Sequence, residues 1–84
     1  MNWQEYIVSD QSILLGKPCI KGTRISVEFI IRLLASGWTE IQIYENYPNI
    51  KAHHLQAVFS YIYDNIHDHL IFSYPTPANV KMAG

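Results

Sequence analysis

In one short stretch of the sequence, the residues that end one helix are followed almost at once by the residues that begin another. Gly37 follows an apolar segment with helical spacing, and glycine often ends a helix in the left-handed conformation. Thr39 and Gln42 then have the spacing of a capping box, in which each side chain bonds the backbone N–H of the other residue. Trp38 and Ile43 are placed to form a hydrophobic staple, which fixes the angle at which the chain enters the helix. The sequence therefore predicts two helices joined by a tight turn.

The helix before this turn is predicted over residues 26–36. Ser26 is a favourable N-cap, and Glu28 stands in the first turn, where the helix dipole favours an acidic side chain. The main apolar stripe has helical spacing and consists of Val27, Ile30, Ile31 and Leu34. The helix after the turn should end by Asn46, because Pro48 disfavours a helical residue before it. A helix of two turns is not stable alone, so its neighbours must hold it.

A third helix is predicted to end near His69. Its apolar residues form one stripe that we expect to be buried: Leu55, Val58, Phe59, Ile62 and Ile66. At its start, Lys51 has no side-chain acceptor to offer, and Asn49 could cap the helix only through a short lead-in. Together these patterns predict a mostly α fold: a three-helix bundle in which Ser26 to His67 is built like a helix-turn-helix, with the third helix as the second helix of that motif.

Extended segments are predicted before the first helix. Residues 3–8 are rich in aromatic and β-branched types and should form a short strand. Two further apolar pieces flank Gly22-Thr23, where the glycine suits the first position of a type II′ hairpin turn. Pro18 cannot donate to a ladder, so its strand should lie at an edge or begin there. The sequence leaves open whether these strands pair within one chain or across a dimer.

The length of the chain limits its core. At 84 residues, folding buries only about 60% of the surface that the unfolded chain exposes. We therefore predict one domain over residues 1–72, followed by a proline-containing tail over residues 73–84 that is available to wrap a partner. Because 49% of the residues are hydrophobic, we expect a partner to cover part of the apolar surface. A homo-oligomer, with a dimer favoured, is the simplest such partner.

Cysteine usage and the apolar runs indicate a cytoplasmic protein. Cys19 is the single cysteine and cannot form an internal disulfide. The chain does not open with a signal-peptide pattern, and none of its apolar stretches approaches the roughly 20 residues that cross a bilayer. We expect no membrane insertion.

A longer motif carries a resemblance to a known family. Residues 16–27 read Gly-Lys-Pro-Cys-Ile-Lys-Gly-Thr-Arg-Ile-Ser-Val, and Gly37-Trp38-Thr39 and Tyr47-Pro48 follow. This pattern resembles the bacterial "domain of unknown function 433" family, over about residues 6–65. The residues of the family motif are Gly16, Lys17, Pro18, Gly22, Thr23 and Arg24. The resemblance implies a homeodomain-like helical core. It also implies an antitoxin that neutralises a PIN-like ribonuclease toxin encoded beside it and represses its own operon.

A helix-turn-helix that reads DNA would place side chains from the start of the third helix at base edges. The candidate DNA-binding residues there are Lys51, His53, His54 and Gln56, and the glutamine could contact adenine through two hydrogen bonds. Arg24 projects from a tight turn and could bind a phosphate or a partner's carboxylate. Each has a structural alternative, because the helix face could simply be solvated and the arginine could pair with Glu28 or with a helix C-terminus.

The charge pattern weakens the prediction of DNA binding. The net charge is −1, whereas a strong hold on phosphate comes from many lysines and arginines. Four of the six basic residues lie close together, however, near the N-terminal segment: Lys17, Lys21, Arg24 and Arg32. We expect any anion-binding surface to include them.

Little in the sequence indicates catalysis or metal binding. Asp64, His67 and Asp68 would lie on one helix face, but a polar face opposite the apolar stripe explains them better, and no zinc-binding spacing is present. Cys19 stands among apolar neighbours and is expected to be buried rather than nucleophilic. We therefore predict no enzyme activity, no cofactor and no metal.

Two functions remain. The first is an antitoxin-like homodimer that binds a PIN-like ribonuclease toxin through its exposed aromatic and tail surface, and operator DNA through the helix-turn-helix. The second is an interaction or assembly domain that contacts protein alone, which the net charge of −1 favours.

Overall fold

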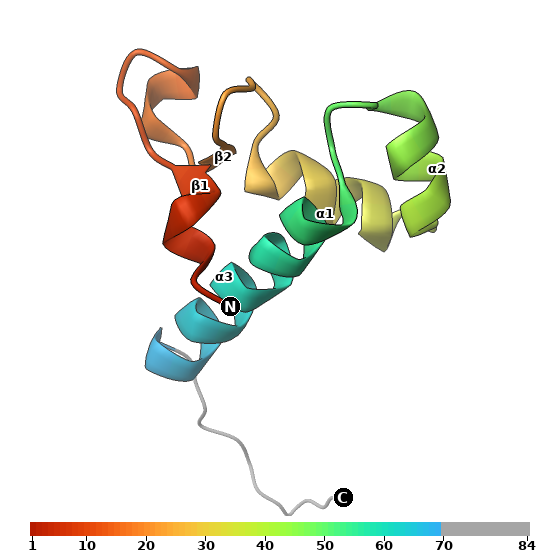
Figure 1. Ribbon diagram of the computed structural model, residues 1–84. Helices are drawn as coiled ribbons and strands as arrows, with labels where there is room; N and C mark the ends of the chain where they lie inside the picture. The colour runs from red at the N-terminus through yellow and green to blue at the C-terminus, as the bar shows by residue number, and fades with distance from the viewer. Residues whose placement is uncertain (70–84) are drawn as a thin grey trace, which may run out of the picture.

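The computed structural model describes residues 1–69 (Figure 1), so the tail predicted over residues 73–84 lies outside the described part of the chain. Its two β-strands are β1 (Ile7–Val8) and β2 (Cys19–Ile20), and its three α-helices are α1 (Val27–Ala35), α2 (Glu40–Asn46) and α3 (Ala52–His69). Short 3-10 turns occur at Trp3–Glu5 and Leu14–Gly16. The prediction of a mostly helical chain with a small N-terminal sheet is confirmed for these residues.

The predicted glycine cap and the predicted capping box at the α1–α2 turn are confirmed. Gly37 has a φ of +97°, and the backbone N–H of Trp38 donates to the carbonyl of Leu33 at 3.0 Å, as in a Schellman motif. The capping box of α2 is complete: the Thr39 N–H donates to Gln42 Oε1 at 2.8 Å, and the Gln42 N–H donates to Thr39 Oγ1 at 3.1 Å. Local sequence thus determines this turn.

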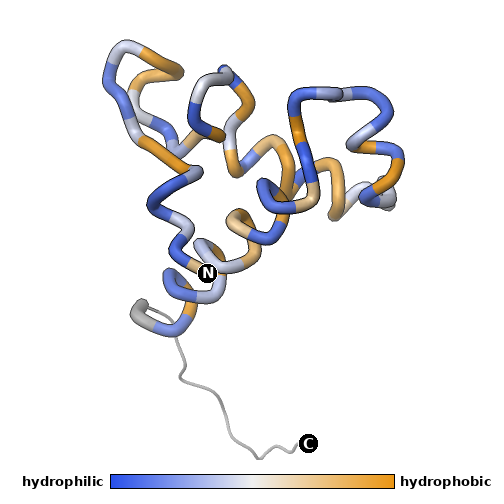
Figure 2. The backbone as a smooth tube through the Cα atoms, viewed as in Figure 1, coloured by the Kyte–Doolittle hydropathy of each residue, from blue (hydrophilic) through white to orange (hydrophobic). Residues whose placement is uncertain are grey.

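Side chains from all parts of the fold meet in one core. Figure 2 shows α1 as a largely hydrophobic helix, and Figure 1 shows it crossing α3. The largest fully buried side chains come from the sheet, the three helices and the turn before α3, and they are Cys19, Ile20, Ile30, Ile43, Ile50, Leu55 and Val58. The single buried residue of α2 is Ile43, and Tyr44 of the same helix is partly buried against the core.

The predicted apolar stripes are partly wrong. On α1, Ile31 of the predicted stripe is 37% exposed. On α3, Leu55 and Val58 are buried as predicted, but Phe59 and Ile66 are 45% and 44% exposed. The physical reason is that the neighbours of α3 cover only part of its circumference. The N-terminal 3-10 turn packs against α3, whereas Phe59, Tyr63 and Ile66 lie where residues 1–69 leave the helix exposed.

The N-terminal segment also differs from the prediction. Only Ile7 and Val8 of residues 3–8 form a strand, because the preceding residues form a 3-10 turn that α3 holds in place. The indole N–H of Trp3 donates to Asp64 at 2.7 Å, and its ring meets Tyr61 edge to face at 4.8 Å. Those two contacts stabilise the helical turn, although the residues of this segment have an intrinsic preference for a strand.

The strands pair within one chain, which answers the question that the sequence left open. β1 pairs antiparallel with β2, with Ile7 opposite Ile20. The predicted type II′ turn at Gly22-Thr23 is wrong by one position. The Thr23 N–H donates to the Ile20 carbonyl at 3.0 Å, so Gly22, with a φ of +81°, is the third residue of the turn, as in type II.

Candidate binding surfaces

The predicted DNA-binding residues divide between two places. Lys51, His53 and Gln56 are exposed at the start of α3, and His54 is half-buried beside them. Arg24 is exposed on the turn that leads into α1 and lines a pocket to which none of these four contributes. The structure therefore brings the α3 residues together and leaves the arginine with a different surface.

A histidine cap that the sequence analysis missed begins α3. The backbone N–H of Lys51 donates to Nδ1 of His54 at 2.9 Å, which gives histidine the position that glutamine has in a capping box. The ring of His54 lies 4.2 Å from that of His53, and Tyr6 packs against both. Desolvation by burial, followed by the nearby charges of His53 and Lys51, lowers the pKa of His54 below its usual value of 6.5. The neutral ring is the form that can accept this hydrogen bond.

This cap predicts a loss of stability in mild acid. The pKa of His54 is lower in the folded chain than in the unfolded chain, so the unfolded state binds the extra proton first as the pH falls. The stabilisation is complete above about pH 6.5 and declines below it. His54→Gln keeps an acceptor that does not titrate, so its melting temperature should fall less than that of the wild type between about pH 7.5 and 5.5. Equal falls, measured by circular dichroism, would contradict the role of this histidine.

A second surface surrounds the family motif. A pocket of about 480 Å³ is lined by Leu14, Leu15, Lys17, Arg24, Ser26, Glu28, Phe29 and Arg32. Lys17 is paired with Glu28 at 3.0 Å, and this hydrogen bond is the main reason that the pKa of Glu28 is lowered. Lys17 therefore takes the place that one structural alternative gave to Arg24 as the partner of Glu28. Among residues 1–69, neither Arg24 nor Arg32 has a carboxylate within 4.0 Å, so both guanidinium groups remain available to a ligand.

Two leucines at the rim of this cationic pocket have an unusual backbone conformation. Leu14 and Leu15 have φ values of +51° and +57°, and Gly16 continues the left-handed turn at +86°. A left-handed conformation costs a residue other than glycine roughly 1–2 kcal/mol. Leu15 gains no burial in return, because it is 83% exposed. Strain combined with an exposed apolar side chain is typical of a binding site.

The glycine and threonine of the motif have a structural role here. Thr23 Oγ1 donates to the Ile20 carbonyl at 2.8 Å and accepts from the Ile25 N–H at 3.0 Å. Gly22 supplies the positive φ of the same turn. The Pro18 carbonyl accepts from the Val27 N–H at 2.9 Å, which ties the motif to the start of α1. These contacts fix the backbone on both sides of Arg24.

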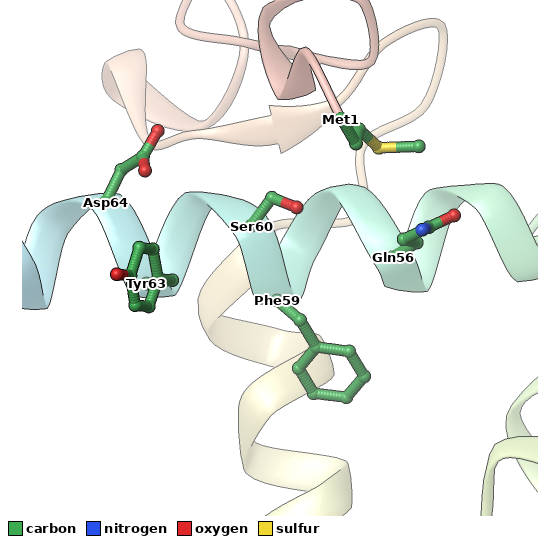
Figure 3. A pocket seen from close by; sticks show the side chains of 6 residues that line it. All are labelled: Met1, Gln56, Phe59, Ser60, Tyr63 and Asp64. Atoms are coloured by element: carbon green, nitrogen blue, oxygen red, sulfur yellow. The ribbon is translucent and has the colours of Figure 1, made fainter.

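A third surface, on α3, includes Phe59, which was predicted to be buried. Figure 3 shows Phe59 and Tyr63 projecting from the same side of the helix, with Met1 lying across from Ser60. A groove of about 340 Å³ lies here, lined by Met1, Gln56, Phe59, Ser60, Tyr63 and Asp64. The missed signal was a second apolar stripe at alternating intervals of three and four residues, which the assignment of Phe59 to the core concealed.

The residues considered for metal binding and nucleophilic chemistry have other surroundings. Within residues 1–69, no group of three or more metal-ligating side chains comes together, and Asp64 accepts the Trp3 indole N–H. Cys19 is buried as predicted, with its Sγ 3.1 Å from the Lys17 carbonyl. Desolvation by burial raises the pKa of its thiol, which disfavours the nucleophilic thiolate.

Over residues 1–69, no helix combines the length and the apolar character of a membrane span.

Comparisons with known proteins agree with the motif. A family described as "Protein of unknown function (DUF433)" matches residues 7–62. A crystal structure of a DUF433 member from Anabaena variabilis is 27% identical to this chain, with a TM-score of 0.70. The match covers 74% of this chain and 61% of that one, so this chain spans about three fifths of that protein's length. None of the curated proteins matches the chain.

Proposed function

The chain belongs to the DUF433 family, and from this premise we propose that it is an antitoxin-like protein that binds and neutralises a PIN-like ribonuclease toxin. The cationic pocket is the surface that we assign to this partner. The proposal is supported by one observation above all: strained Leu15 stands exposed beside the unpaired Arg24 and Arg32.

The composition of this pocket favours a protein partner. Leu14, Leu15 and Phe29 provide the apolar part of its lining, and Arg24 and Arg32 add two guanidinium groups. An exposed leucine gives its largest gain when an apolar pocket of a protein receives it. Arginine forms two parallel hydrogen bonds to a carboxylate. The complementary partner surface is therefore an apolar pocket bordered by acidic side chains.

Co-elution tests this proposal directly. The protein is mixed with the product of the neighbouring gene, and the mixture is passed through size-exclusion chromatography at micromolar concentration. We expect one stable complex and a loss of the partner's ribonuclease activity. Separate elution of the two proteins, with undiminished ribonuclease activity, would refute the neutralising role.

DNA binding is a second candidate function, with α2, the turn and α3 acting as a helix-turn-helix. Its support is the exposure of Lys51, His53 and Gln56 together at the start of α3. In a helix-turn-helix this is the segment that contacts base edges. Repression of the protein's own operon would use this surface, while the toxin uses the cationic pocket.

A double substitution tests this second candidate. Lys51→Ala together with Gln56→Ala should weaken binding to the protein's own promoter about 10- to 100-fold, because it removes a phosphate contact and a base contact. Fluorescence anisotropy at near-physiological salt measures the effect, with scrambled DNA of equal length as the control. If the wild type binds both DNAs equally, the repressor function is excluded and the interaction domain without nucleic acid is retained.

A further inference from the structure

An apolar stripe on α3 is left uncovered by residues 1–69. Gln56, Phe59, Tyr63 and Ile66 follow one another at intervals of three, four and three residues, which is the spacing of a helix seam that packs against another helix. Phe59 is 45% exposed, Tyr63 66% and Ile66 44%. Two aromatic rings and an isoleucine on one helix face form a larger apolar patch than single exposed hydrophobics do.

We propose that this α3 stripe binds the α3 stripe of a second copy of the chain, as an antiparallel helix pair about a twofold axis. The spacing of the stripe is self-complementary. Phe59 and Tyr63 lie two residues on either side of position 61, so antiparallel pairing places the phenylalanine of each copy opposite the tyrosine of the other. The same operation places Gln56 opposite Ile66. A twofold interface requires this kind of reciprocal contact.

The charge of the stripe favours a second copy over a charged partner. Its four residues include no aspartate, glutamate, lysine, arginine or histidine, and the ring of His67 lies beside the stripe, 5.7 Å from that of Tyr63. The carboxylate at its edge, Asp64, already accepts a hydrogen bond from the Trp3 indole. Two copies therefore meet without like-charge repulsion, and their antiparallel helix dipoles attract each other. The four residues of the stripe offer no cation that could bind a phosphate backbone or an acidic protein.

The exposed area indicates a reversible dimer. The exposed fractions of Phe59, Tyr63 and Ile66 correspond to roughly 300 Å² for each copy, and a standard interface buries about 800 Å² on each side. The neighbouring groove contributes further surface, because Met1 is 53% exposed and Gln56 and Ser60 line the same groove. We expect a dissociation constant in the micromolar range.

This dimer does not depend on the proposed toxin binding. The cationic pocket is built from residues 14–32, so the α3 stripe shares no residue with it. The dimer does compete with DNA reading, however, because pairing covers Gln56. DNA should therefore bind the monomer, and variants that break the dimer should bind the promoter at least as well as the wild type.

Matched charge insertions test the interface. Tyr63→Glu places an unpaired charge in the proposed seam and should raise the dimer dissociation constant at least about 100-fold. Ile41→Glu inserts the same charge on α2, at a residue that is 65% exposed, compared with 66% for Tyr63. This control should change the dimer dissociation constant less than about twofold. Sedimentation equilibrium from about 1 to 200 µM measures both constants, and circular dichroism confirms that the variants fold.

Cross-linking tests the antiparallel arrangement and does not rely on a destabilising variant. Copies carrying Gln56→Cys, mixed with copies carrying Ile66→Cys, should form a mixed disulfide under mild oxidation, because the two positions face each other across the pair. Either variant alone should cross-link much more slowly, and buried Cys19 should not react. A wild-type chain that stays monomeric at the highest concentration overturns the proposal. A dimer that Tyr63→Glu leaves intact also overturns it, because such a dimer forms through another surface. Faster cross-linking within a single variant than between the two variants overturns the antiparallel arrangement, because it indicates a parallel pair.

Discussion

Replacing Ile43 with alanine is expected to lower the free energy of unfolding by about 3 kcal/mol and to detach α2 from the domain. Ile43 is fully buried and is the one buried residue of this seven-residue helix. A helix of this length is not stable in isolation. The capping box fixes where the helix begins, but it does not supply the apolar burial that holds it against the core. A loss of this size is a large fraction of the stability of so small a domain.

Chemical denaturation measures the loss of stability, and hydrogen exchange shows where it occurs. In Ile43→Ala, the amides of α2 should lose their protection while those of α1 and the first half of α3 keep most of theirs. Ile41→Ala is the matched control, because Ile41 belongs to the same helix and is 65% exposed, so its cost should stay within about 0.5 kcal/mol. Equal effects of the two substitutions would show that burial of Ile43 does not hold α2.

Replacing Leu15 with asparagine is expected to change stability and binding in opposite directions. Asparagine tolerates the left-handed conformation better than leucine, and Leu15 is 83% exposed, so little packing is lost. The free energy of unfolding should rise by up to about 1 kcal/mol. Affinity for the ribonuclease partner should fall about 10- to 100-fold, because a leucine that becomes buried in a complex contributes about 1.5–3 kcal/mol.

Isothermal titration calorimetry and thermal melting measure these two effects on the same samples. Ile41→Asn removes a similar apolar side chain far from the cationic pocket, and should leave the affinity for the partner unchanged while lowering stability slightly. If Leu15→Asn binds the partner as well as the wild type, the exposed leucine is not part of the interface. If it also lowers stability, the left-handed turn is not a source of strain.

Helix boundaries could be predicted well because their signals are local. Ser26, Gly37 and the Thr39–Gln42 pair act through hydrogen bonds to backbone atoms three to five positions away. The start of α3 was harder to predict, because a histidine that accepts through Nδ1 has to be neutral. Its burial favours that neutral form, and the sequence around it does not show how deeply the ring is buried.

The candidate surfaces were harder to predict, since exposure is not a local property. Phe59 belongs by spacing both to the stripe through Leu55 and Val58 and to the stripe through Tyr63 and Ile66. The packing of α1 and the N-terminal turn against α3 decides between them. The cationic pocket likewise unites residues of the Leu14–Gly16 turn with Arg24 and α1, and no spacing rule relates these segments.

The sequence by itself determined the turn between α1 and α2. A glycine that can adopt a positive φ and a reciprocal capping box specify that turn whatever surrounds it. Only the tertiary structure decided which apolar side chains are buried. It also decided that residues 3–5 form a helical turn and that Lys17, rather than Arg24, pairs with Glu28. The physical reason is that hydrogen bonds across a few residues are set by local backbone geometry, whereas burial and ion pairing depend on segments that folding brings together from distant parts of the chain.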